Sequence, residues 1–213
     1  MWEDILFKAI NETLIMVFVS TLFAVLIGFI PAVILILTAP DGLKPNKGIY
    51  KTLGLIVNLL RSMPFIILMV IVVPITKAIV GTSIGIRGAI VPLTIAAAPF
   101  VARILESSLR EVDKGVIEAA KSFGATNSQI IFKVMLKEAT PSIILGITLT
   151  IINIVGYSAM AGAVGAGGLG AAAIQYGYYR FQSDITFYTV LILIVFVQGL
   201  QSLGNYIYKK QTK

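Results

Sequence analysis

The amino-acid sequence predicts an all-α integral membrane protein with five transmembrane helices. The 213 residues are 57% hydrophobic and only 13% charged, with a mean hydropathy of +0.93, whereas a soluble domain carries about a quarter charged residues. The apolar residues gather in long runs. Basic residues flank those runs, where they set the orientation of a protein in a membrane. This placement of the +7 net charge argues for membrane lipid, and against nucleic acid, as a partner.

Five stretches are long enough to span a bilayer, since a helix needs about 20 mostly apolar residues to cross ~30 Å of hydrocarbon. They are residues 13–38, 53–76, 84–104, 142–164 and 185–207. A short polar turn at 81–85 joins the second span to the third. The second span contains Arg61, Pro64 and Pro74, so it is expected to be bent or tilted where neighbouring helices satisfy the freed backbone groups. Together the spans form one domain over residues 1–213.

Lysine and arginine predict the orientation of the spans. Because cytoplasmic loops are enriched in both, the C-terminus is expected in the cytoplasm and the N-terminus outside. The segments placed in the cytoplasm hold twelve basic residues: Lys44, Lys47, Lys51, Arg103, Arg110, Lys114, Lys121, Lys133, Lys137, Lys209, Lys210 and Lys213. The outer segments hold four: Lys8, Lys77, Arg87 and Arg180. The long charged segment 105–141 is therefore expected to face the cytoplasm.

The charged segment 105–141 has helical order. Over 112–123 the apolar residues recur at the spacing of one helix face, and they are Val112, Val116, Ala119, Ala120 and Phe123. Gly124 is expected to end this helix in a left-handed conformation. Thr126 and Gln129 then form a capping box that begins a second helix. The apolar side of that helix carries Ile130, Ile131, Val134 and Met135.

Two interpretations of these amphipathic helices are open. They lie on the lipid headgroups as interfacial helices, or they form a docking element for a cytoplasmic partner. The small pair Ala119–Ala120 favours docking, because it lets another surface approach closely.

The segment resembles the EAA loop of ABC importer permeases. The resemblance rests on Glu118-Ala119-Ala120, on Gly124, and on the nearby Val134, Leu136 and Pro141. The Leu-Pro that is usual in the family is replaced by Leu136-Lys137. In that family the loop forms a coupling helix that sits in a cleft of the ATPase subunit. The resemblance implies a type I ABC importer permease fold, with ATPase coupling by Glu118, Ala119, Ala120, Phe123, Gly124 and Ala125.

A separate motor subunit is expected. The sequence contains no G-x-x-x-x-G-K-[ST] motif, so the chain cannot bind ATP phosphates through a P-loop. Because ABC motors work as pairs, the resemblance implies a homodimer of this chain with two copies of a cytoplasmic ABC ATPase. The partner ATPase then binds ATP and Mg²⁺, and this chain has no cofactor of its own. The absence of His and Cys excludes thiolate and imidazole metal sites and Ser-His-Asp triads, so no catalytic or metal-binding residue is expected.

Residues 156–170, which read GYSAMAGAVGAGGLG, are rich in small side chains. Gly165, Gly167 and Gly170 match G-x-G-x-x-G, but the stretch ends a membrane-length run and follows no strand, so a dinucleotide site is not expected. Small residues recur every four positions, as in Ser158, Gly162, Ala166 and Gly170. Such a stripe lets helices pack closely, or it marks a breakable helix end that lines the substrate path.

This stretch narrows the resemblance to the permease subunits of bacterial methionine importers. The resemblance runs from about Glu12 to the basic tail. It also includes RSMPFIILMVIVVP at 61–74, GTSIG at 81–85 and VPLTIAAAPFVAR at 91–103. It implies import of L- and D-methionine across the bacterial inner membrane by alternating access. An extracytoplasmic methionine-binding lipoprotein would deliver the substrate.

Four side chains are candidates for the substrate path. Tyr157, Ser158 and Met160 lie in the small-residue stretch. Met160 either fills a packing gap with its flexible thioether or meets the methionine side chain in the passage. Arg61 stands about nine residues into the second span. It either snorkels to the interface, or it lines a gate or cavity or contacts the cytoplasmic loop, since a charge at that depth is expensive.

The sequence leaves three alternatives to methionine import. An ABC permease of the same fold for another small amino acid or peptide differs only in substrate. An ion-coupled secondary transporter usually has intramembrane acids or paired repeats. Here the ten acids lie in or near the loops, and the sequence has no repeat. A membrane enzyme is disfavoured because the sequence lacks His, Cys and a clustered carboxylate pair.

Overall fold

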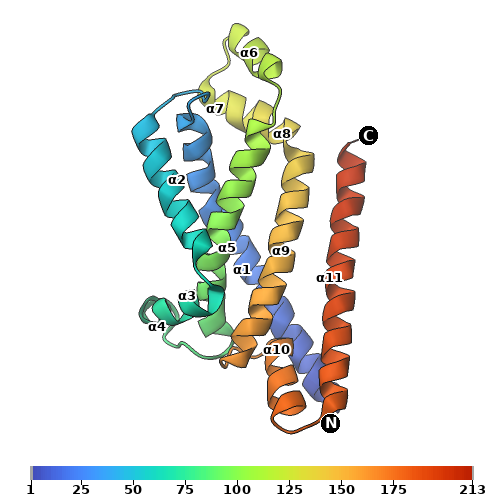
Figure 1. Ribbon diagram of the computed structural model, residues 1–213. Helices are drawn as coiled ribbons and strands as arrows, with labels where there is room; N and C mark the ends of the chain where they lie inside the picture. Colours follow the sequence, from blue (N-terminus) through green and yellow to red (C-terminus); the bar gives the residue numbers. More distant parts are fainter. Residues whose placement is uncertain (1, 213) are drawn as a thin grey trace.

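The computed structural model describes residues 2–212, and every element in that range is helical, which confirms the predicted all-α fold (Figure 1). Four long helices run along an elongated bundle: α1 (Trp2–Thr38), α5 (Gly85–Arg110), α9 (Thr140–Ala163) and α11 (Ser183–Gln211). α2 (Lys47–Ser62) lies against α1 and α5. α3 (Phe65–Ile71) and α4 (Val73–Val80) follow it.

Shorter helices lie near the two ends of the bundle. One end holds α6 (Lys114–Ser122), α7 (Asn127–Gln129), the π-helical η1 (Ile130–Met135), α8 (Leu136–Glu138) and the C-terminal end of α11 (Figure 1). We call this the loop end. The opposite end holds the start of α1, α10 (Gly168–Ala172) and the π-helical η2 (Ala173–Tyr178).

The long helices extend beyond the apolar runs that predict them. Within residues 2–212, four segments are long and apolar enough to cross a membrane, and the bent pair α2–α3 makes a fifth if it counts as one span. α1 begins at Trp2 rather than at residue 13, and α5 ends at Arg110 rather than at residue 104. The thickness of the hydrocarbon limits the apolar run, whereas the helical backbone continues into polar residues on either side.

The second predicted span, residues 53–76, is not one helix. α2 ends at Ser62, and α3 begins at Phe65 after a bend of 106°. Pro64 explains the break, because the residue before a proline is driven out of the helical region, and Met63 is extended with φ −76° and ψ 128°. The expected bend is present, but the segment is divided among α2, α3 and α4.

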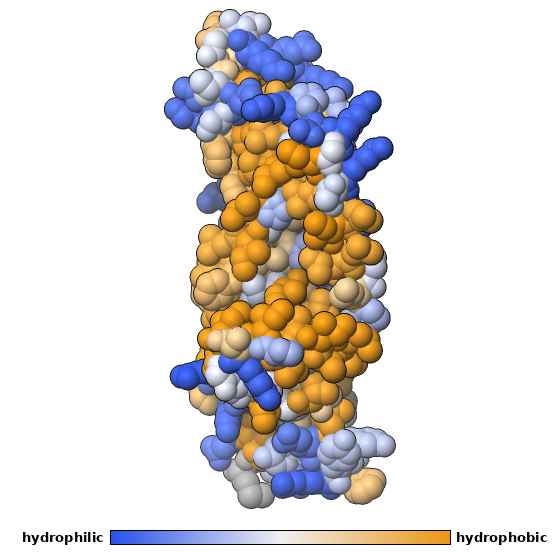
Figure 2. Space-filling model, turned by 90° about the vertical axis from the view of Figure 1, so that its left-hand side faces the viewer, coloured by the Kyte–Doolittle hydropathy of each residue, from blue (hydrophilic) through white to orange (hydrophobic). Residues whose placement is uncertain are grey.

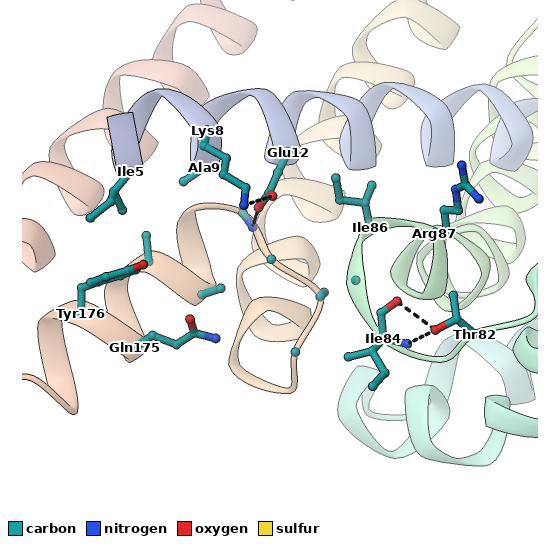
Figure 3. Close-up of a pocket in the computed structure, with 17 residues that line it drawn as sticks. Ile5, Lys8, Ala9, Glu12, Thr82, Ile84, Ile86, Arg87, Gln175 and Tyr176 are labelled. Carbon is teal, nitrogen blue, oxygen red and sulfur yellow. Dashed lines mark hydrogen bonds and ion pairs between the residues drawn. The ribbon is translucent and has the colours of Figure 1, made fainter. Parts of the chain in front are cut away.

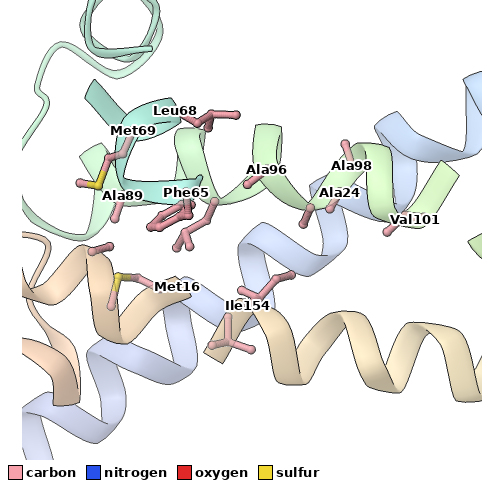
Figure 4. Packing of buried hydrophobic residues seen from close by; sticks show 14 of the residues in the cluster. Met16, Ala24, Phe65, Leu68, Met69, Ala89, Ala96, Ala98, Val101 and Ile154 are labelled. Carbon is pink, nitrogen blue, oxygen red and sulfur yellow. The ribbon is translucent and has the colours of Figure 1, made fainter. Parts of the chain in front are cut away.

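The contact between α1 and α5 forms the centre of the bundle. On α1, the small residues Ser20, Ala24, Gly28 and Ala32 recur every four positions, and all are buried. Small side chains in this register let two helix backbones approach closely. Ala98 belongs to the matching surface of α5, so the packing here depends on close contact rather than on large side chains (Figure 4).

The outer surface carries an apolar belt. Phe18 of α1, Leu55 of α2 and Val195 of α11 are among its large exposed side chains. Figure 2 shows a hydrophobic zone between two hydrophilic ends. Because helices satisfy their own backbone hydrogen bonds, a helical bundle with such a belt is suited to a hydrocarbon environment.

Candidate functional site

α6 projects from the loop end of the bundle (Figure 1). Asp113 caps it, because its carboxylate accepts hydrogen bonds from the backbone amides of Gly115 at 2.7 Å and Val116 at 3.4 Å. The helix therefore begins at Lys114 and not at residue 112 as the apolar spacing predicts. Val112 lies before the cap and is buried in the body of the protein.

The apolar residues of α6 do not form the single face that the sequence predicts: some pack against the chain and others are exposed to solvent. Ile117 and Ala120 pack against an apolar cluster of the same chain that includes Leu109 and Met135. Glu118 and Ala119 are exposed. Val116 is 39% exposed, and Phe123, just past the end of the helix, is 91% exposed. Val116, Ala119 and Phe123 therefore form an uncovered apolar surface on the free side of α6, which we call the α6 free face.

The turn after α6 follows the predicted chemistry. Gly124 has a left-handed φ of 76°, as a residue just past a helix end requires. Ala125 is half-buried against the same cluster as Ala120. Thr126 and Gln129 form the predicted capping box, with Thr126 N–H donating to Gln129 Oε1 at 2.8 Å and Gln129 N–H donating to Thr126 Oγ1 at 3.3 Å.

The second helix of the loop packs on the protein itself. Ile130, Ile131 and Met135 are nearly fully buried in the cluster beneath α6. Their apolar side is therefore covered by the chain and not available to lie on headgroups. This arrangement holds α6 at a fixed position above the ends of α1, α5 and α9, and it favours the docking interpretation.

A network of polar side chains ties α2 to α5 near the loop end. Glu106 of α5 is only 2% exposed. Its carboxylate accepts a hydrogen bond from Tyr50 Oη at 3.0 Å and a short ion-pair contact from Arg103. Arg103 also donates to Asn58 Oδ1 of α2 at 3.0 Å. A buried carboxylate needs such partners, because an unpaired one is costly to remove from water.

The network continues to the α1–α2 connection through Arg110. Its guanidinium donates to Tyr50 Oη at 3.2 Å and to both carboxylate oxygens of Asp41 at 3.0 and 3.3 Å. Partial burial raises the pKa of Asp41, but its backbone hydrogen bond and the charge of Arg110 lower it by more, so this pKa lies below its ordinary value. The pair therefore stabilises the fold above the ordinary pKa of Asp, and the contribution is lost as the pH falls through the lowered pKa.

We expect Glu106→Gln to lower the stability of the fold by about 1 kcal/mol. The amide keeps the shape of the side chain, but a hydrogen bond to a neutral group is worth about 1 kcal/mol less than one to a charged group. Thermal unfolding of the purified protein in detergent measures the change. Glu138→Gln, at an exposed carboxylate, is the matched control and should leave the transition unchanged. Equal transitions for wild type and Glu106→Gln would contradict the stabilising role of the network.

The glycine-rich stretch forms a helical hairpin near the opposite end of the bundle. α9 ends at Ala163, and the chain turns through Gly165, Gly167 and Gly168, which all have positive φ. The predicted break in the helix is therefore present. The four-residue stripe does not lie on one helix, however, because α10 folds back against α9. A Cβ on Gly170 would lie 2.1 Å from the carbonyl oxygen of Ala159, so the hairpin closes only with glycine there.

Two residues of α1 cap α10 across this hairpin. Glu12 accepts a hydrogen bond from Gly168 N–H at 2.7 Å, and Thr13 Oγ1 accepts one from Leu169 N–H at 2.9 Å. Lys8 Nζ lies 3.9 Å from the Glu12 carboxylate. Capping by side chains from another helix satisfies the free amides at a helix start. Local sequence patterns do not predict this contact. Its one sequence signal is the pair Glu12–Thr13 at the start of the first apolar run.

A cavity of about 580 Å³ lies beside this hairpin (Figure 3). It is bounded by the start of α1, by the loop before α5 and by α10 with η2. Its charged and polar lining includes Lys8, Glu12, Arg87, Gln175 and Tyr176. Because Glu12 already caps α10 and faces Lys8, part of this lining serves the fold.

The three predicted path residues on α9 do not share one surface. Tyr157 is half-buried, and its ring stacks on Phe65 of α3 with 4.8 Å between centroids. Ser158 is buried and donates to the carbonyl of Val155 at 2.7 Å. Met160 is 47% exposed. Of the three, Met160 alone presents its side chain to an open surface.

Arg61 lies at the end of α2 that is distant from the loop end (Figure 1). Its guanidinium carbon lies 4.9 Å from the centroid of the Phe100 ring on α5, an arrangement typical of a cation–π contact. The side chain is exposed. Arg61 therefore lies beside Phe100 of α5 and not against residues 105–141.

Comparisons with known proteins agree with this architecture. Residues 24–210 match the family described as binding-protein-dependent transport system inner membrane component. The chain is 50% identical over 203 residues to the probable D-methionine transport system permease protein MetI of Vibrio cholerae, covering 95% of this chain and 90% of that protein. It is 46% identical over 174 residues to the methionine import system permease protein MetP of Bacillus subtilis, covering 82% and 78%.

Solved structures show the same fold. A chain of the inward-facing MetNI methionine ABC transporter superposes with a TM-score of 0.96 at 46% identity, covering 98% of this chain and 97% of that one. An amino acid ABC transporter solved with histidines has a TM-score of 0.81 at 18% identity and shares the fold alone. Since the family match covers most of the helical bundle and the relatives align over nearly its whole length, the chain belongs to the family of binding-protein-dependent transport system inner membrane components.

Proposed function

We propose that the chain is the membrane-spanning permease subunit of an ATP-driven importer of L- and D-methionine. The observation that carries this proposal is the near full-length similarity to permeases named for methionine transport, at 50% identity in one case. The fold supports it as well, since the chain superposes on the permease of a methionine ABC transporter with a TM-score of 0.96. Transport proceeds by alternating access.

The proposed assembly is a homodimer of this chain with two copies of a cytoplasmic ABC ATPase. The α6 free face is the docking surface for the ATPase, and it is exposed and apolar as a binding surface requires. Ala119 and Phe123 would contact the ATPase as parts of this face, whereas Ala120, Gly124 and Ala125 hold α6 on the protein. Glu118 lies on the other side of α6, where it lines a groove with Asp41 and Lys121. The ATPase binds ATP and Mg²⁺, and an extracytoplasmic lipoprotein delivers methionine to the other side of the membrane.

In the proposed path, Met160 faces the substrate, while Tyr157 holds α9 against α3 by stacking on Phe65. Ser158 donates to the Val155 carbonyl within α9 itself. Arg61, whose guanidinium contacts the Phe100 ring of α5, is proposed to lie at a gate or at the edge of the transport path. An arginine at this depth is favourable only where it meets water, a partner or an aromatic ring.

The loop end is proposed to face the cytoplasm, with the N-terminus outside. The polar loop end carries most of the lysine and arginine residues of the loops, and cytoplasmic loops are enriched in these. We expect single cysteines introduced near Lys47, Lys121 and Lys210 to be protected from an impermeant thiol reagent in intact cells. A cysteine near Asp184 should be labelled. Labelling at residue 121 from outside would reverse the topology.

Substrate identity is tested by uptake competition. Cells that produce the chain with its ATPase and binding protein should take up labelled methionine, and excess unlabelled L- or D-methionine should abolish the uptake. Other amino acids at the same excess should leave it nearly unchanged. Uptake that another amino acid or a small peptide suppresses better than methionine does would assign the permease to that substrate instead.

A further inference from the structure

One face of α9 is not covered by any other helix in the part of the chain that the structure describes. It carries Leu149, Asn153, Gly156 and Met160, at steps of four, three and four residues, and all four are exposed. The neighbouring Ile154 is fully buried in the core between α9 and α1 (Figure 4). The four exposed residues have the spacing of one helix face. α9 therefore has one side that packs in the core and another that is open.

Asn153 is the unusual member of this face. It is the fourteenth of the 24 residues of α9, so it lies well inside the apolar zone. The Asn153 side chain is exposed. Within residues 2–212 its amide makes no hydrogen bond. A polar amide that faced hydrocarbon without a partner would be unfavourable by several kcal/mol. The open face of α9 is therefore expected to meet a polar surrounding or another protein surface, and not lipid tails.

Gly156 leaves a notch between Asn153 and Met160. A Cβ built on Gly156 would meet no atom within 4 Å, so no neighbour requires glycine there. The two flanking residues are seven positions apart, which is about 10 Å along a helix axis. Side chains on a helix generally lean toward its N-terminus, and for Met160 that is the side of the notch. The spacing along the axis is comparable to the length of an extended amino acid.

We propose that Asn153, Gly156 and Met160 form a subsite of the transport path for a zwitterionic amino acid with an unbranched apolar side chain. This inference rests on the proposed function and names the residues that recognise its substrate. The Asn153 amide donates from nitrogen to a carboxylate and accepts at oxygen from an ammonium group. The notch at Gly156 and the Met160 thioether take the apolar side chain.

The uncharged side chains of this subsite suit transient binding of the substrate during transport. A transport site must bind strongly enough to admit its substrate and weakly enough to release it. An amide contributes hydrogen bonds without a net charge, and a thioether contributes soft, adaptable contacts. Selectivity for a thioether substrate then comes from shape and dispersion, while Asn153 orients the charged end.

The experiment compares four variants in the complete transporter, reconstituted in proteoliposomes with its ATPase and binding protein. Asn153→Leu removes the amide and keeps the volume, and it should raise KM for methionine uptake about tenfold, which equals ~1.4 kcal/mol. Asn153→Gln keeps the amide and should restore most of the loss. Val195→Leu, on the exposed face of α11, is the control and should leave KM unchanged.

Three readouts accompany KM. The mass of the complex in detergent and the ATP hydrolysis stimulated by the loaded binding protein should be the same for Asn153→Leu and the wild type.

Gly156→Val should fill the notch and shift the ranking of competing amino acids toward smaller side chains. An unchanged KM in an assembled Asn153→Leu transporter would overturn the proposal. Loss of the assembled complex would also overturn it and would assign Asn153 to a contact between two copies of the chain.

The wild-type control separates this inference from the proposed function. If the wild type takes up another amino acid and not methionine, the methionine assignment fails. The KM of Asn153→Leu for that amino acid then still decides whether Asn153 belongs to the path.

Discussion

Replacing Ala119 by glutamate is expected to prevent stable assembly with the ATPase. Ala119 is exposed at the centre of the α6 free face, between Val116 and Phe123. In the proposed complex this face would be desolvated, and a carboxylate without a partner there would cost on the order of 3 kcal/mol or more. At ~1.4 kcal/mol per tenfold change, affinity for the ATPase should fall by two or more decades. Co-purification of the two subunits from membranes measures the loss.

Lys121→Gln is the matched control for this prediction. It makes net charge more negative by one, as Ala119→Glu does, but lies on the other side of α6 beside Asp41 and Glu118. It should retain the ATPase. Ala120→Glu is a weaker test than Ala119→Glu, because Ala120 packs against the chain's own cluster and its replacement would also disturb the fold. Normal assembly of Ala119→Glu would show that the ATPase binds elsewhere.

Gly170→Val is expected to have the largest effect on folding. Any Cβ at residue 170 meets the Ala159 carbonyl oxygen at 2.1 Å and its Cα at 2.6 Å, and valine adds two more carbons. Because backbone atoms cannot move aside as a side chain can, α10 must separate from α9, and Glu12 and Thr13 then lose their hydrogen bonds to Gly168 and Leu169. Overpacking typically costs about 1–3 kcal/mol, and the lost caps add about 1 kcal/mol each.

The measurement is the yield of folded protein in detergent by size-exclusion chromatography, followed by thermal unfolding. Gly199→Val is the control, because a Cβ at Gly199 of α11 meets no atom within 4 Å. It should behave as the wild type does. A Gly170→Val protein with the wild-type transition would mean that α10 does not pack against α9 as described.

The sequence predicts those parts of the structure that local chemistry decides. Long apolar runs locate α1, α5, α9 and α11, because a membrane span must satisfy its backbone hydrogen bonds within the helix. Gly124 and the Thr126–Gln129 capping box are predicted correctly for the same reason, since each depends on a few adjacent residues.

Contacts between distant segments are not predictable from local patterns. The Glu12 carboxylate meets Gly168, 156 positions later, and Tyr50 meets Glu106, 56 positions later. The apolar spacing of residues 112–123 predicts a helix face, but it does not tell which side the protein covers and which side it leaves open. The stripe through Ser158 and Gly170 has a helical period, yet the positive φ of Gly165 divides it between two helices.

An ATPase is proposed to drive methionine through this chain. The most direct test is accumulation of labelled methionine in proteoliposomes that contain this chain, its ATPase and its binding protein. With ATP supplied on the ATPase side and no ion gradient, methionine should accumulate above its external concentration, and Ala119→Glu should abolish the accumulation. Accumulation without ATP, driven by a sodium or proton gradient, would contradict the account and would indicate a secondary transporter.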